Sequence, residues 1–170
     1  MLESKYIVLK FAAGNIFTGT YVRTDGTDGV LSFGRPFTSY PTKLRINYKY
    51  TSATINRTNS SYGYEYLEGR PDSCFIYVAL TDWDAPREIR TKPKEQQLFD
   101  TKDSNIIAYG EFTSGTTSSR YQQLDVELEY RNYRTPKYLV IVCTASKYGD
   151  YFAGGEGSTL WLDEFELLYD

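Results

Sequence analysis

The stretch Thr42–Ser52, TKLRINYKYTS, alternates apolar and polar residues from Lys43 to Tyr50. One set of alternating positions holds Leu44, Ile46, Tyr48 and Tyr50, and the other holds Lys43, Arg45, Asn47 and Lys49. Successive side chains of a strand point to opposite faces of a sheet. The period of two therefore predicts a half-buried β-strand with a basic outer face.

Three other stretches extend this pattern. Leu124–Arg131, LDVELEYR, alternates in the same way and predicts a strand with an acidic outer face, with a short amphipathic helix as the weaker alternative. Cys74–Leu80 and Tyr138–Cys143 are instead apolar on both faces and rich in β-branched and aromatic residues. Such runs are typical of central strands that are covered on both sides.

The remaining strand-like segments bring the total to roughly nine strands, separated by turn residues. These segments are Lys5–Phe11, Phe17–Val22, Gly29–Phe33, Ile106–Phe112 and Thr159–Tyr169. The polar stretch Asp82–Asp103 predicts an excursion between strands, with one edge strand near Glu88–Thr91. No long amphipathic helix is evident, which favours an antiparallel sandwich or barrel. We therefore expect residues 1–170 to form one all-β domain, a two-sheet antiparallel β-sandwich of jelly-roll type.

Composition excludes several classes of function. The 170 residues include no histidine, 19 Lys and Arg, and 22 Asp and Glu, for a formal net charge of −3. The lack of histidine excludes Ser-His-Asp and Cys-His catalysis in their usual form, imidazole zinc sites and histidine pH switches. The charge gives no general attraction for nucleic acid. The apolar runs are too short to span a membrane as helices.

The two cysteines, Cys74 and Cys143, both lie inside apolar runs. Free cysteine packs as a small hydrophobic residue, so two buried free thiols are the favoured interpretation. A disulfide bridge between neighbouring strands is the alternative.

The chain has a surplus of aromatic residues, with 17 Tyr, 9 Phe and 2 Trp. A sandwich core uses only part of them, and the others cluster in connections as Tyr62, Tyr64, Tyr66, Trp83, Tyr148, Tyr151 and Phe152. The face of such a ring packs on the C–H face of a sugar, while neighbouring polar groups bond the hydroxyls. The alternative is that these rings only pack against the protein itself.

Acidic residues stand out at two places in the chain. Asp82 and Asp84 flank Trp83 directly after a buried strand, where they could bind a sugar, supply oxygens to Ca²⁺, or cap a turn. Asp163 falls on the apolar face of the last strand when positions are counted inward by twos from Tyr169. An unpaired buried carboxylate is costly. A bulge that turns it outward, a basic partner or a bound Ca²⁺ could each satisfy it.

Catalysis would have to depend on carboxylates. A retaining glycosidase needs two carboxyl groups about 5–5.5 Å apart. Glu127 and Glu129 are two positions apart on one face of a predicted strand, a spacing compatible with such a pair, but both lie on the face expected to be solvated. We therefore expect no catalytic residues.

The stretch Ala153–Ser158, AGGEGS, lacks the lysine of a phosphate-binding loop and predicts a flexible connection.

Two ordered stretches resemble a known family. The first combines Gly14–Gly19, GNIFTG, with Phe33–Phe37, FGRPF, and the second combines Ala145–Ser158, ASKYGDYFAGGEGS, with Leu160–Leu167, LWLDEFEL. Together they resemble the putative carbohydrate metabolism domain found in surface lipoproteins of gut Bacteroidetes. The resemblance covers the whole chain and carries over no catalytic residues.

The resemblance implies a β-jelly-roll like those of carbohydrate-binding modules and galactose-binding-like domains. It also implies the C-terminal domain of a longer, secreted outer-membrane lipoprotein at the bacterial cell surface, held there only by an N-terminal lipid anchor.

With the aromatic surplus, this predicts a non-catalytic module that binds an oligo- or polysaccharide. The candidate ligand-binding residues are Arg35, Asp82, Trp83, Asp84, Tyr148, Asp150 and Tyr151, and the candidate Ca²⁺ ligand is Asp163. A carboxylate-dependent glycoside hydrolase or lyase is one alternative. A structural or adhesive protein-interaction domain is the other, and it predicts a flat apolar patch without a groove. The sequence does not fix the oligomeric state.

Overall fold

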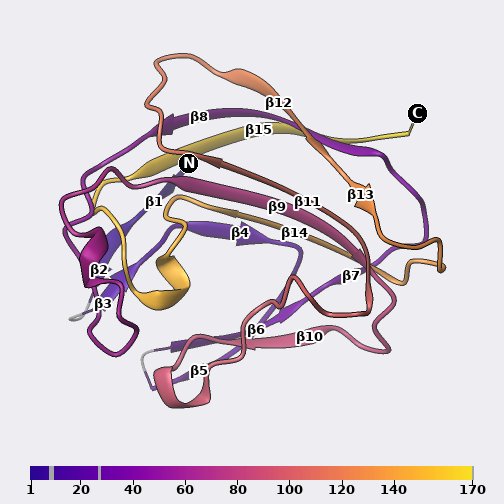
Figure 1. The fold of residues 1–170 in the computed structure, drawn as a ribbon, viewed down its shortest axis with the longest axis horizontal. Helices are drawn as coiled ribbons and strands as arrows, with labels where there is room; N and C mark the ends of the chain where they lie inside the picture. Colours follow the sequence, from indigo (N-terminus) through magenta and orange to yellow (C-terminus); the bar gives the residue numbers. More distant parts are fainter. Residues whose placement is uncertain (8–9, 27, 170) are drawn as a thin grey trace.

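The fold is given by a computed structural model that describes residues 1–7, 10–26 and 28–169 (Figure 1). The strands are β1 (Leu2–Glu3), β2 (Lys5–Ile7), β3 (Lys10–Ala12), β4 (Asn15–Phe17), β5 (Gly19–Asp25), β6 (Asp28–Phe33), β7 (Arg35–Pro36), β8 (Lys43–Thr51), β9 (Cys74–Thr81), β10 (Arg87–Arg90), β11 (Ile106–Ser114), β12 (Gln122–Glu127), β13 (Glu129–Tyr130), β14 (Tyr138–Thr144) and β15 (Thr159–Leu168). Three short 3-10 turns accompany them: η1 (Glu65–Leu67), η2 (Pro93–Glu95) and η3 (Gly149–Tyr151). The all-β prediction is confirmed.

The strands form layered antiparallel sheets. One sheet has the order β1-β15-β8-β12, a second has the order β13-β11-β9-β14-β4 with β7 also paired to β14, and a third has the order β10-β6-β5. Strands β2 and β3 form a separate pair. Figure 1 shows the sheet that contains β9 and β14 in the middle, with β8, β12 and β15 on one side of it and β5, β6 and β10 on the other.

The main core lies between the first two sheets. The apolar positions of β8 are buried and its polar positions are partly exposed, as the alternation predicts. Tyr50 and Ile46 pack in one cluster with Ile76, Val78 and Leu80 of β9, whose side chains on this face are fully buried. The sandwich therefore follows directly from the period of two in the sequence.

A second core lies on the other face of β9 and β14. There, Tyr77 and Val142 pack against Phe33 of β6 and Ile89 of β10. Both strands are thus covered on both sides, as their continuous apolar sequence predicts. The cover is a third sheet, which the prediction of a two-sheet sandwich did not include. It contains the edge strand predicted near Glu88–Thr91, observed as β10.

Three predicted strands are each divided in two. Lys5–Phe11 gives β2 and β3, which pair with each other, and residues 8 and 9 lie outside the described residues. Phe17–Val22 gives β4 on the middle sheet and β5 on the third sheet. Leu124–Arg131 gives β12, paired with β8, and β13, paired with β11. In Leu124–Arg131 the chain changes sheets without interrupting the alternation of buried and exposed side chains, so the pattern could not reveal the division.

Cys74 and Cys143 are free and fully buried, as favoured over a disulfide. Burial raises the pKa of each thiol to about 12. In the described part of the chain, no helix is long and apolar enough to cross a membrane.

Candidate functional site

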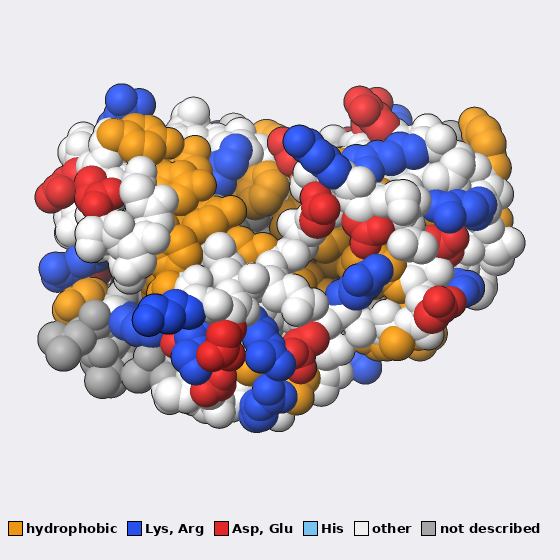
Figure 2. Space-filling view, turned by 60° about the horizontal axis from the view of Figure 1, so that its bottom comes forward, with side chains coloured by type: hydrophobic (Ala, Val, Ile, Leu, Met, Phe, Trp, Pro, Cys, Tyr) orange, Lys and Arg blue, Asp and Glu red, His pale blue; other side chains and the backbone are white. Residues whose placement is uncertain are grey.

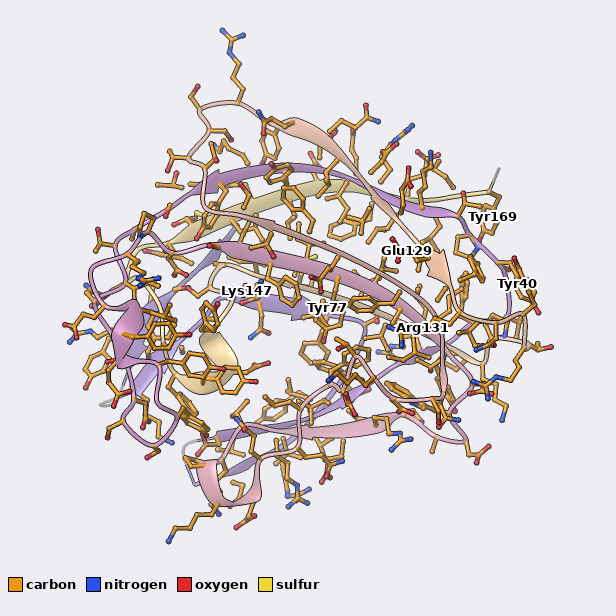
Figure 3. All side chains as sticks on the ribbon, in the orientation of Figure 1. Tyr40, Tyr77, Glu129, Arg131, Lys147 and Tyr169 are labelled. Atoms are coloured by element: carbon orange, nitrogen blue, oxygen red, sulfur yellow. The ribbon has the colours of Figure 1, made fainter. Side chains whose placement is uncertain are left out.

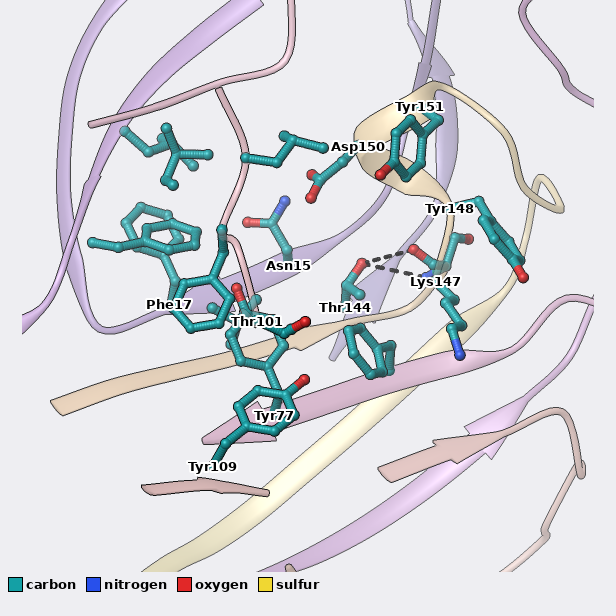
Figure 4. Close-up of a pocket in the computed structure, with 18 of the residues that line it drawn as sticks. Asn15, Phe17, Tyr77, Thr101, Tyr109, Thr144, Lys147, Tyr148, Asp150 and Tyr151 are labelled. Carbon is teal, nitrogen blue, oxygen red and sulfur yellow. Dashed lines mark hydrogen bonds between the residues drawn. The ribbon is translucent and has the colours of Figure 1, made fainter. Parts of the chain in front are cut away.

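A cavity of about 300 Å³ lies between the middle sheet and the third sheet (Figure 4). Its floor is made by alternate residues of neighbouring strands, which share one face because side chains alternate along a strand. The floor residues are Asn15, Phe17, Phe75, Tyr77, Tyr109, Val142 and Thr144. The opposite wall is made by Leu31, Phe33, Ile89, Leu98, Phe99 and Thr101. The cavity is thus an open continuation of the second core.

The end wall of the cavity comes from two connections that are far apart in the sequence. Tyr148 precedes η3, Tyr151 is the last residue of η3, and Tyr64 precedes η1. The ring of Tyr64 lies 4.7 Å from that of Tyr151 and 5.1 Å from that of Tyr148, measured between centroids. Tyr62 Oη also donates a hydrogen bond of 2.6 Å to the carbonyl oxygen of Thr91, directly after β10. The loop tyrosines therefore form one rim at the cavity.

Among the described residues that line the cavity, only Asp150 carries a carboxylate. Its side chain points into the cavity, towards Asn15 (Figure 4). It remains open to solvent, and no described residue gives its carboxylate a hydrogen bond or ion pair. The surrounding protein still desolvates it enough to raise its pKa. The negative charge of Asp150 also acts on Tyr77 in the floor of the cavity. Burial is the larger cause of the raised pKa of Tyr77, and the charge of Asp150 is the second.

The wall that carries Asp150 is anchored by Asp72, which the sequence reasoning missed. Asp72 is 1% exposed, and its Oδ2 accepts hydrogen bonds from Ser146 Oγ at 2.5 Å, Gly155 N at 2.8 Å and Ser158 Oγ at 2.9 Å. Burial raises the pKa of this carboxyl group, while the hydrogen bonds oppose that shift. An acidic residue two positions before a buried strand was the available signal, but nothing in the sequence identifies its partners.

The glycine-rich stretch of this wall is closely packed, in contrast to the flexible connection predicted. Gly154 and Gly155 are both buried. A Cβ on Gly154 would lie 2.4 Å from Phe11 Cζ, and a Cβ on Gly155 would lie 2.9 Å from the carbonyl oxygens of Ala53 and Thr54. The glycines are therefore needed for close approach of the backbone to its neighbours.

The structure brings together three of the predicted ligand-binding residues: Tyr148, Asp150 and Tyr151. The others lie near the opposite ends of β9 and β14. On β14, Thr144 is at the cavity, whereas Tyr138 pairs with Thr81, directly before Asp82. Six residues of strand separate these two positions by roughly 20 Å.

Trp83 is 3% exposed and packs in the second core. Its Nε1 donates a hydrogen bond of 2.9 Å to Asp103 Oδ2, and Arg87 lies over its ring. No ring face is left for a sugar, so this placement matches the alternative in which the indole covers the rim of the core.

The other expected residues have protein partners or lie elsewhere on the surface. Asp82 accepts a hydrogen bond from Asn105 and forms an ion pair of 2.9 Å with Arg134. Asp84 is fully exposed and forms an ion pair of 2.9 Å with Lys137. Arg35 is exposed on β7, opposite Leu139 of β14. These residues do not converge on the cavity.

Asp163 lies at a bulge in β15. The register with β8 shifts between Asp163 and Glu166, Glu164 has a φ of 52°, and Asp163 is exposed. Its Oδ1 accepts a hydrogen bond of 2.9 Å from the Glu164 backbone. Of the three ways to satisfy this carboxylate, the bulge is the one observed. Among the described residues, no three Asp, Glu or Cys side chains form a group that could hold a metal ion.

The possible catalytic pair Glu127 and Glu129 lies outside the cavity. Glu127 is exposed and near Lys43, and Glu129 is exposed on β13.

Figure 2 shows hydrophobic side chains gathered in a hollow on the face that the third sheet and the connections border, with charged side chains around it.

Comparisons with known proteins give a family and a fold. A family model described as "Putative carbohydrate metabolism domain" matches residues 2–168. A solved structure described as a putative glycoside hydrolase from Bacteroides thetaiotaomicron VPI-5482 is similar, with a TM-score of 0.70 and 23% identity over 94% of this chain and 48% of that chain.

A second structure, described as a putative glycoside hydrolase from Bacteroides vulgatus ATCC 8482, has a TM-score of 0.65 and 23% identity over 94% of this chain and 65% of that chain. The chain thus spans about half to two-thirds of the length of these structures. A search of curated proteins gave no match. At this identity the two structures support the fold alone.

Proposed function

The chain belongs to the putative carbohydrate metabolism domain family, and from that membership we propose that it is a non-catalytic module that binds an oligo- or polysaccharide. In this proposal the domain is a jelly-roll of the carbohydrate-binding-module type. It acts at the surface of a bacterial cell, as part of a longer lipid-anchored protein that captures or uses glycans.

The cavity with the unpaired carboxylate of Asp150 carries the proposal. Aromatic rings form its floor and rim, and the polar groups of Asn15, Thr101, Thr144 and Asp150 lie among them. A sugar has apolar C–H faces that pack on rings and hydroxyl groups that need hydrogen-bond partners. Concave apolar sites with a few convergent polar groups are the usual form of small-ligand sites.

Binding is favoured over hydrolysis by the number of carboxylates. Glycosidases commonly use two carboxyl groups, about 5–5.5 Å apart in retaining enzymes and about 6.5–9.5 Å apart in inverting ones. Within residues 1–7, 10–26 and 28–169, the lining of the cavity contributes one carboxyl group, that of Asp150. The lining also supports binding over a purely structural role, because that alternative predicts a flat patch without a groove.

The test is a glycan array followed by titration calorimetry on the purified domain. We expect one glycan class to bind with a dissociation constant of roughly micromolar to millimolar. Tyr151→Ala and Asp150→Ala should each weaken binding by about tenfold or more, because each removes a group that lines the cavity.

Tyr133→Ala is the matched control. Tyr133 is 85% exposed and stacks on Tyr130, which in turn stacks on Tyr40. Figure 3 shows Tyr40 at the end of the molecule opposite Lys147, which lines the cavity. Tyr133→Ala should therefore bind as the wild type does. An array without reproducible binding at high protein concentration, or equal losses in all three variants, would contradict the proposal.

A further inference from the structure

We propose that the cavity binds a sugar that carries a free amino group, held as the ammonium ion by the Asp150 carboxylate between tyrosine rings. The inference rests on the proposed function and specifies its ligand class. It follows from three features of the lining: an unpaired carboxylate, three rim tyrosines (Tyr64, Tyr148 and Tyr151) with no described Lys or Arg over their rings, and a lysine that is already engaged.

Asp150 differs from the other aspartates around the second core and the middle sheet. Hydrogen bonds or ion pairs with other residues engage the carboxylates of Asp72, Asp82, Asp84 and Asp103. Asp150 has no such partner among residues 1–7, 10–26 and 28–169, and it points into a space that a ligand can enter. A carboxylate in partly apolar surroundings is stabilised most by a cation with N–H donors.

The rings of Tyr64, Tyr148 and Tyr151, which form the rim beside Asp150, have no cation of the described residues over them. Elsewhere the chain places its own cations over aromatic faces, such as Lys49 over Trp161 at 4.1 Å and Arg57 over Tyr6 at 4.2 Å. In the described part of the chain, no Lys or Arg lies over the rings of Tyr64, Tyr148 or Tyr151. A ligand cation near such ring faces is attracted by the ring quadrupole.

Lys147 is the one cationic residue that the described part of the chain contributes to the lining, and it does not pair with Asp150. Its Nζ donates a hydrogen bond of 3.2 Å to Thr113 Oγ1 and lies 5.1 Å from the centroid of Phe75. Figure 4 shows its amino group directed away from Asp150. The lining therefore has a negative end at Asp150, where an ammonium group fits. The neutral polar groups of Asn15, Thr101 and Thr144 are available to the sugar hydroxyls.

The size of the cavity favours a short ligand segment. At about 300 Å³ it is at the small end of ligand pockets, which span about 300–1,000 Å³. The cavity thus suits the end of a chain or a single unit, with the rim tyrosines contacting what extends beyond it.

The experiment compares three β-1,4-linked oligosaccharides of equal length by titration calorimetry in 0.15 M salt: one of glucosamine, one of N-acetylglucosamine and one of glucose. We expect the glucosamine oligomer to bind about tenfold tighter or more than the other two, because only it carries ammonium groups. Repeating the titration in high salt separates this preference from the general attraction of a negatively charged protein for a cation.

Two variants locate the preference. Asp150→Asn should abolish it while leaving any binding of the uncharged oligomers, because the amide keeps the shape and loses the charge. Asp84→Asn removes an equal charge from a fully exposed site outside the cavity, and it should keep the preference.

Equal affinity for the three oligomers would overturn this inference and leave the proposed function standing. No binding of any oligosaccharide, on the array or by calorimetry, would overturn both. A preference for a uronic acid oligomer that is lost in Lys147→Gln would overturn the inference, since the site would then recognise an anion.

Discussion

Asp72 and Ser146 lie 74 positions apart in the chain and meet in a buried hydrogen bond of 2.5 Å, from Ser146 Oγ to Asp72 Oδ2. The same oxygen accepts hydrogen bonds from Gly155 N and Ser158 Oγ. A single carboxylate oxygen therefore holds both ends of the connection between β14 and β15, which carries Tyr148, Asp150 and Tyr151.

Asp72→Ala should destabilise the protein strongly. The substitution leaves three buried donors without their acceptor, and each such group costs about 1–3 kcal/mol. We expect the free energy of unfolding, measured with urea, to fall by about 3 kcal/mol or more. Asp125→Ala removes an exposed carboxylate paired with Arg45 and should change the midpoint little. Similar midpoints for the two variants would show that the network does not hold the wall.

Gly154→Ala should also destabilise the protein, because of overpacking. The new methyl group would lie 2.4 Å from Phe11 Cζ and 2.8 Å from Ser146 Oγ. Overpacking of this kind costs about 1–3 kcal/mol. In Gly29→Ala the methyl group would meet its nearest atoms at 3.7 Å, so this control should be tolerated within about 0.5 kcal/mol. Thermal unfolding of both variants checks the difference, and equal melting temperatures would contradict the close packing of Gly154.

Trp83→Phe should lower stability without changing sugar binding. It removes the hydrogen bond from Nε1 to Asp103 Oδ2, at a cost of about 1–3 kcal/mol. Tyr151→Ala should show the reverse pattern, with weakened binding and a smaller change in stability, because Tyr151 is only half-buried. Calorimetric titration and urea unfolding of both variants separate the two roles. A loss of binding in Trp83→Phe at full stability would place the indole in the site.

The pKa values of Asp150 and Asp84 should be shifted in opposite directions. Desolvation raises the pKa of Asp150, whereas the hydrogen bond from Lys137 lowers that of Asp84. The native state thus holds the Asp150 proton more tightly than the unfolded state does. Its contribution to stability is complete below the unfolded pKa, near 3.8, and is lost as the pH rises through the native pKa.

Carboxyl carbon chemical shifts measured by NMR across a pH series report both groups directly. Asp150 should titrate at a higher pH than Asp84. The opposite order would show that the cavity does not desolvate Asp150.

The fold is predictable from the sequence where the pattern is local. The alternation in β8 predicts the strand and its buried face, because period and burial are linked in a strand. The continuous apolar character of Cys74–Leu80 predicts cover on both sides. The same apolar character does not identify the elements that cover the strand. It is equally compatible with an element earlier in the chain, such as β6, and with one that follows, such as β10. The change of sheets at Leu128 is hidden because its side chain stays on the buried face throughout.

The site is only partly predictable, because the sequence pattern reveals local proximity and not contacts made across the fold. Tyr148, Asp150 and Tyr151 are within four residues of one another, so their proximity is local and could be inferred. Tyr64 joins them through contacts across the fold that no spacing encodes. Trp83 shows the converse problem, because a polar, Asp-flanked position appears exposed in the sequence while tertiary packing buries the ring.

The floor of the cavity has a consequence for how recognition and folding are linked. Phe75, Tyr77, Val142 and Thr144 are on one face of β9 and β14, and the other face of the same strands completes the main core. A ligand on this floor would contact strands that also carry the main core, so its binding would stabilise the folded domain as a whole. Occupancy would then raise resistance to heat and proteolysis in proportion to the logarithm of ligand concentration. At the cell surface that we propose for it, the domain would last longest wherever the proposed glycan ligand is abundant.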